Sequence, residues 1–175
     1  MLKKWRYKGL PIRPLIFRNL LILLPLSFGV SRPPDLISLS VGVFDFMRHR
    51  HRTCEFSFEY QFQLPSPTEW VLFRPITGAM VTARGANYFY GGINFDFIFY
   101  KIIVISPGIA AGWYNACGGK NLGFPLEFRS CLEIAWQRPN FQRLGTRISH
   151  MSNASFGKRN PGEESLVIFY SVPIN

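Results

Sequence analysis

The sequence has no apolar run long enough to cross a membrane as a helix. Its longest run, residues 20–30, falls far short of the roughly 20 residues such a helix needs, and Pro25 interrupts it. Charged residues make up only 17% of the chain, and its three cysteines are odd in number and lack metal-ligand spacing. Apolar residues, in contrast, make up 47% of the chain, and this content excludes a disordered or fibrous protein. The length of 175 residues fits a single domain.

The net charge of +10 does not indicate a nucleic-acid-binding protein. Seven of the 20 Lys and Arg residues lie in residues 1–32, which hold no Asp or Glu, so the remainder carries only +3. A basic stretch followed by a short apolar run is typical of a secretory signal. We therefore predict a signal peptide over residues 1–32 and a single domain over residues 33–175, with a disordered basic tail as the alternative for the first segment.

From residue 36 onward, apolar and polar residues alternate with a period of two, which predicts β-strands. In the clearest segment, apolar residues at every even position from Cys54 to Phe62 alternate with polar residues from Glu55 to Gln63. Looser versions of this pattern recur between turn-type residues. The predicted strands cover residues 36–46, 53–64, 70–81, 88–99, 102–114, 125–137, 142–152 and 164–172.

Short connections between these strands predict an all-β fold with antiparallel neighbours, closed into a barrel without a free edge. The alternation does not distinguish a soluble lipocalin-like carrier, with phenylalanines inside, from a membrane barrel, with phenylalanines outside. The signal sequence and the rows of Phe, which face away from rows of Glu, Gln and Asn, favour an eight-stranded antiparallel transmembrane β-barrel. Its lumen would then hold Glu55, Glu59, Asp96, Glu127, Arg129 and Glu133.

The topology follows from the even number of strands. With an exported N-terminus on the periplasmic side of a Gram-negative outer membrane, the connections after the odd-numbered strands face the cell exterior. These connections are residues 47–52, 82–86, 115–124 and 153–163.

Three polar residues interrupt the lipid-facing side of the last two strands. His150 and Ser152 share a face with Leu144 and Ile148, and Glu164 shares a face with Leu166 and Ile168. If Ser152 pairs with Glu164, His150 lies opposite Leu166 and diagonal to Glu164, close enough for the polar groups to meet. A serine, a histidine and a carboxylate on one patch form a nucleophile, base and orienter set. The alternative is a non-catalytic structural or adhesive barrel in which these are ordinary interfacial residues.

The residues around this cluster resemble a known signature. The run from His150 to Ser155, followed by Asn160-Pro161-Gly162 and Glu164, closely resembles the outer-membrane lipid A 3-O-deacylases, the PagL family. The resemblance extends back through residues 122–123, 126–130 and Gly145, and more loosely to residues 90–92 and Asp96.

The resemblance implies an eight-stranded barrel that hydrolyses the ester-linked acyl chain at the 3-position of lipid A. By the same resemblance, Ser152 is the nucleophile, His150 the general base and Glu164 the third member of a triad. Asn153 and Asn160 match positions near the oxyanion hole, and Phe128 matches an aromatic position beside the active site. No metal and no cofactor are implied.

The first exterior connection carries the basic run Arg48-His49-Arg50-His51-Arg52. Because arginine forks suit phosphate groups, we hypothesise that Arg48, Arg50 and Arg52 bind the lipid A head group, aided by Lys158 and Arg159 in the last connection. The alternative is a solvated basic loop. The predicted partners are lipid A, or lipopolysaccharide, and the outer membrane, and the sequence leaves open whether the barrel forms a homodimer.

Overall fold

The computed structural model describes residues 33–66 and 68–174, so the predicted signal peptide lies outside the described residues. Within those residues, no helix is long and apolar enough to span a lipid bilayer. All eight predicted strands are present: β1 (Asp35–Phe44), β2 (Thr53–Gln61), β3 (Val71–Thr82), β4 (Asn87–Phe99), β5 (Ile103–Asn115), β6 (Leu126–Gln137), β7 (Arg143–Ser152) and β8 (Glu163–Ile174).

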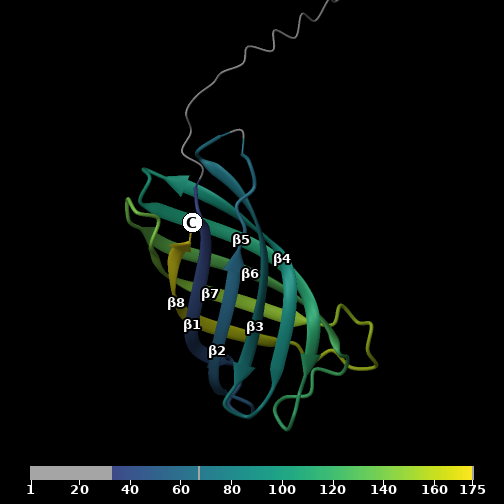
Figure 1. Cartoon of the computed structure of the whole chain (residues 1–175). Coiled ribbons are helices and arrows are strands. Elements are labelled where there is room, and N and C mark those ends of the chain that lie inside the picture. The colour runs from purple at the N-terminus through teal and green to yellow at the C-terminus, as the bar shows by residue number, and fades with distance from the viewer. Residues whose placement is uncertain (1–32, 67, 175) are drawn as a thin grey trace, which may run out of the picture. The chain divides into compact units, whose positions relative to one another are not determined.

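Each strand pairs with its neighbour in antiparallel orientation, and β1 pairs with β8 to close the barrel (Figure 1). The predicted all-β fold, with its closed antiparallel topology, is confirmed. Because the order is strictly up and down, the connections after β1, β3, β5 and β7 lie together at the end opposite the start of β1 and the end of β8 (Figure 1).

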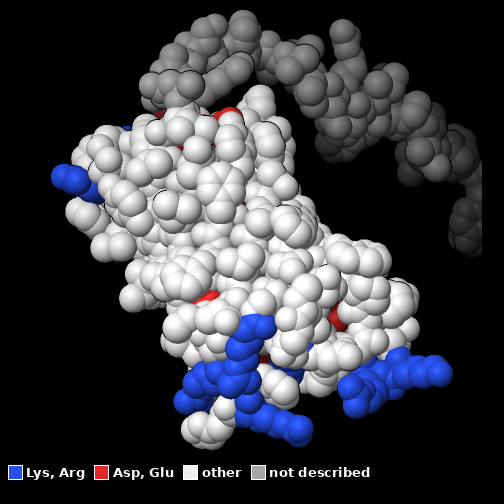
Figure 2. All heavy atoms as spheres, turned by 60° about the horizontal axis from the view of Figure 1, so that its bottom comes forward, with Lys and Arg blue, Asp and Glu red and all other residues white. Residues whose placement is uncertain are grey.

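The apolar rows face outward. In β2, Phe56 is 51% exposed and Phe58 45% exposed, while Glu55, Ser57 and Glu59 between them are buried. This arrangement contradicts the soluble-carrier alternative, which needs the phenylalanines inside, and it is that of a membrane barrel. In the space-filling view the barrel wall is almost free of charge, and most of the visible Lys and Arg side chains gather at one end (Figure 2).

Several charged side chains pair with one another inside the lumen. Glu59 accepts hydrogen bonds from Arg129 (3.0 Å) and Arg147 (3.1 Å), although these three residues come from β2, β6 and β7. A second group lies around Asp96, which contacts Arg74 and Arg143 at 2.7 Å each. All these charges are buried, as are the other predicted lumen charges Glu55, Glu127 and Glu133, so that prediction is confirmed.

Candidate active site

The polar patch predicted from β7 and β8 is on the outer wall. It lies at the end of the barrel that carries the connections after β1, β3, β5 and β7. Leu144 and Ile148 are exposed on the outward face of β7, and His150 lies on the same face with half of its side chain exposed. Ser152, the last residue of β7, is half-buried. The predicted outward orientation of His150 is therefore confirmed.

The predicted register of this hairpin is wrong by two residues. His150, not Ser152, pairs with Glu164, and Leu166 pairs with Ile148. A shift of two residues keeps every side chain on its own face, so alternation could not have distinguished the two registers. In the structure, β8 begins at Glu163, whose side chain faces inward. The Glu163 carboxylate accepts hydrogen bonds from the Ser165 hydroxyl at 3.0 Å and from the Asp45 N–H at 3.4 Å.

The corrected register brings the histidine and the carboxylate into direct contact. The His150 Nδ1 atom lies 3.3 Å from the Glu164 Oε1 atom, and 19% of the Glu164 side chain is exposed. With Nδ1 as the donor of this hydrogen bond, the Nε2 atom is left to accept a proton. A histidine and carboxylate in this arrangement can act as a base and its orienter.

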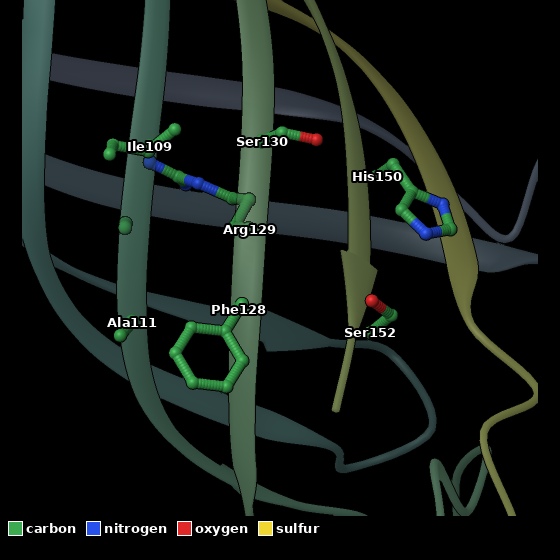
Figure 3. Close-up of a pocket in the computed structure, with 8 residues that line it drawn as sticks. Ile109, Ala111, Phe128, Arg129, Ser130, His150 and Ser152 are labelled. Carbon is green, nitrogen blue, oxygen red and sulfur yellow. The ribbon is translucent and has the colours of Figure 1, made fainter. Parts of the chain in front are cut away.

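Ser152 lies next to this pair but is not hydrogen-bonded to it. Among residues 33–66 and 68–174, no hydrogen bond joins Ser152 to His150. Both residues line one shallow groove of about 480 Å³ that crosses β5, β6 and β7 (Figure 3). Hydrogen bonds between catalytic groups often form only when substrate is bound. The shared groove therefore places Ser152 and His150 where one substrate could contact both.

The rest of the groove is mostly apolar. Its walls include Ile109, Ala111 and Phe128, with Ser130 paired opposite His150 (Figure 3). Phe128 pairs opposite Ser152, and its ring lies 5.9 Å from that of Phe156 in the last connection. The predicted site residue Phe128 is therefore an exposed wall of the groove beside the serine.

Asn153 is the buried centre of the hydrogen bonds in the last connection, and Asn160 is one of its partners. Asn153 is completely buried, and its Nδ2 donates to the carbonyls of Leu122 (2.9 Å) and Arg159 (2.8 Å). Its Oδ1 accepts from the Ser155 N–H, and its own N–H donates to the Asn160 Oδ1 at 3.1 Å. The Asn153 side chain thus joins two connections and is not available to a substrate.

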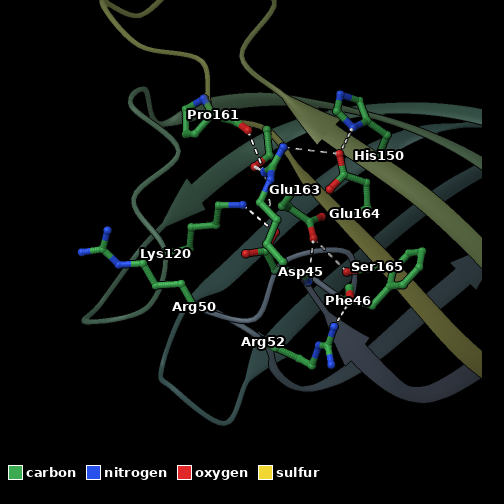
Figure 4. Close-up of polar contacts among 12 residues, drawn as sticks. Asp45, Phe46, Arg50, Arg52, Lys120, His150, Pro161, Glu163, Glu164 and Ser165 are labelled. Carbon is green, nitrogen blue, oxygen red and sulfur yellow. Dashed lines mark hydrogen bonds and ion pairs between the residues drawn. The ribbon is translucent and has the colours of Figure 1, made fainter.

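The three arginines of the first connection differ in their contacts. Arg48 donates from Nη1 to the carbonyls of Pro161 (2.9 Å) and Gly162 (3.0 Å), contacts that the sequence did not reveal. Arg52 donates to the Phe46 carbonyl, and Arg50 is exposed (Figure 4).

In the described part of the chain, no group of three His, Cys, Asp or Glu side chains is arranged to hold a metal ion.

Comparisons with known proteins identify the family and the fold. The family model described as Lipid A 3-O-deacylase (PagL) matches residues 54–173. The Lipid A deacylase PagL of Pseudomonas aeruginosa is 37% identical over 67 residues, an alignment that spans 38% of this chain and 39% of the length of that relative.

Two solved barrels are similar in structure. The crystal structure of the outer membrane enzyme PagL superposes with a TM-score of 0.67 at 22% identity, covering 79% of this chain and 99% of that one. Neisserial surface protein A superposes with a TM-score of 0.52 at 9% identity, over 80% of this chain and 97% of the other. At these identities the likeness concerns the fold.

Proposed function

Because the chain belongs to the lipid A 3-O-deacylase (PagL) family, we propose that it is an outer-membrane serine esterase that removes the 3-O-acyl chain of lipid A. In this proposal Ser152 is the nucleophile, His150 the general base and Glu164 the residue that orients the imidazole. The observation that carries it is the 3.3 Å contact between His150 and Glu164 on the outward face, beside the groove that also contains Ser152.

The position of these residues supports a lipid substrate. A polar cluster on a lipid-facing wall costs free energy unless it lies near the interface or has a function. The cluster is at the end of β7 and start of β8, near the connections that face the exterior if the N-terminus is exported. Lipid A occupies the outer leaflet, so its ester bonds would reach the groove without leaving the membrane.

The reaction then follows serine-hydrolase chemistry. The Ser152 Oγ attacks the ester carbonyl carbon while its proton passes to the His150 Nε2, and Glu164 stabilises the imidazolium. The tetrahedral intermediate collapses as the imidazolium protonates the departing ester oxygen, which frees the sugar 3-hydroxyl and leaves an acyl group on Ser152. Water, deprotonated by His150, attacks that ester, the fatty acid departs, and the proton returns to Ser152.

The groove and the last connection supply the remaining parts. The apolar groove wall formed by Ile109, Ala111 and Phe128 suits an acyl chain. Since the N–H groups of Asn153 and Ser155 are already used within the connection, the Ala154 N–H and the Asn160 side-chain amide are the oxyanion donors that we propose.

The basic rim suits the phosphorylated head group. Exposed Arg50 and Arg52 in the first connection and Lys158 and Arg159 in the last belong to the same end of the barrel, where Figure 2 shows cationic side chains gathered. Arg48 is left out of this rim because its guanidinium already donates to the Pro161 and Gly162 carbonyls. Arginine forks bind phosphate in a bidentate manner, so we propose that this rim holds the lipid A phosphates while the ester lies in the groove.

Mass spectrometry of lipid A tests the proposal. Cells expressing the wild-type chain should lose one 3-hydroxyacyl chain from lipid A, and cells expressing Ser152→Ala should not. Heat-modifiable gel mobility confirms that both barrels are assembled. Unchanged lipid A in both strains, and also in detergent-solubilised membranes where any latency is relieved, would favour the non-catalytic structural barrel instead.

A further inference from the structure

The Arg48 side chain reaches from the connection after β1 to the segment that introduces β8. Its Nη1 atom donates to two successive carbonyls, Pro161 at 2.9 Å and Gly162 at 3.0 Å. Gly162 has a positive φ of 59° and immediately precedes β8, so the chain turns sharply here just before Glu164. Arg48 therefore fixes the turn from which the carboxylate-bearing strand begins.

The same guanidinium also faces the catalytic carboxylate. Its Nη2 atom lies 3.9 Å from the Glu164 Oε1, the oxygen that contacts His150 Nδ1 at 3.3 Å. A cation at this distance attracts the carboxylate and limits the positions that the flexible glutamate side chain can adopt. Glu164 is thus held between an arginine on one side and the imidazole on the other.

Backbone contacts align the two segments beneath this arginine. The Phe46 N–H donates to the Glu164 carbonyl at 2.9 Å, and the Arg48 N–H donates to the Asp45 carbonyl at 3.1 Å. Asp45 is completely buried and accepts a hydrogen bond from Lys120 at 2.6 Å (Figure 4). The base of the first connection is therefore a fixed support from which Arg48 extends.

We propose that Arg48 is a positioning residue for the reaction, which acts by holding Glu164 against His150. This inference rests on the proposed function of the triad and assigns Arg48 a role distinct from head-group binding. Phosphate binding would act on the substrate, whereas positioning acts on the imidazole whatever the substrate carries.

Kinetics with two substrates separate these roles. Arg48→Ala should lower kcat about tenfold, the size expected for one contact to a charged group at a half-exposed site, on both phosphorylated and dephosphorylated lipid A. KM should change less than twofold. Arg48→Lys, which keeps the charge but lacks the planar fork that reaches two carbonyls, should fall between Arg48→Ala and the wild type. Arg138→Ala, an exposed arginine at the opposite end of the barrel, is the matched control.

A second readout does not depend on activity. With His49→Gln and His51→Gln, His150 is the only histidine of the chain, and its ¹⁵N NMR signals in micelles report the Nδ1 hydrogen bond directly. Arg48→Ala should weaken that hydrogen-bond signature while the barrel stays folded.

Three results would overturn the inference: an unchanged kcat, a loss confined to the KM for phosphorylated lipid A, or an unchanged His150 signal. If the wild type itself does not deacylate lipid A, the proposed function fails, but the NMR comparison still decides whether Arg48 positions the pair.

Discussion

Replacing Glu164 with alanine tests how much the proposed third member of the triad contributes to catalysis. The His150 to Glu164 contact is 3.3 Å long, and half of the histidine side chain is exposed. Hydrogen bonds to charged groups contribute about 1.5 to 3 kcal/mol, and this one is longer than the 2.7 to 2.9 Å typical of strong charge-assisted pairs. At about 1.4 kcal/mol per tenfold change in rate, kcat/KM should fall roughly 10- to 150-fold, towards the lower end.

The assay measures release of the 3-hydroxy fatty acid from purified lipid A by the detergent-solubilised barrel. Glu69→Ala is a matched control, because Glu69 is 57% exposed and belongs to the connection after β2, at the other end of the barrel. Ser152→Ala sets the baseline. An unchanged kcat/KM in Glu164→Ala would refute the orienting role. A fall to the Ser152→Ala baseline would show that this long, half-exposed contact contributes more than we infer.

Three further predictions concern the lumen, the last connection and the basic rim. Glu59→Ala leaves the buried Arg129 and Arg147 without their shared carboxylate, so the free energy of unfolding in urea should fall by about 3 to 5 kcal/mol; a loss below 1 kcal/mol would contradict the ion-pair network. Asn153→Ala removes the bonds that join two connections and should raise the rate of limited proteolysis within them, whereas unchanged cleavage would show that other contacts hold them. Arg50→Ala should raise KM for phosphorylated lipid A roughly two- to fivefold and leave KM for dephosphorylated lipid A unchanged, and equal effects on both would refute phosphate binding.

The strands and the direction of their side chains could be predicted from the sequence because both depend on a period of two. Glu55, Phe56 and Glu59 have the faces that their alternation predicts. The membrane orientation also followed, since a row of phenylalanines opposite a row of charged residues suits lipid outside and a polar lumen inside.

The pairing between strands could not be predicted in the same way. The position of Glu164 opposite His150 depends on where the last connection ends, and a register shifted by two residues satisfies the same alternation. The lumen pair of Glu59 with Arg147 joins residues 88 positions apart, and only closure of the barrel brings them together. The hydrogen bonds from Arg48 to Pro161 and Gly162 likewise span the junction of the first and last hairpins.

Labelling with a fluorophosphonate tests the central claim, a reactive serine on the lipid-facing wall, most directly. This probe forms a covalent adduct with serines activated by a neighbouring base, and peptide mass spectrometry identifies the modified residue. We expect one adduct, on Ser152, formed in step with the loss of lipid A deacylation and absent in His150→Ala. An adduct on a different serine, or full inactivation with Ser152 unmodified, would contradict the account.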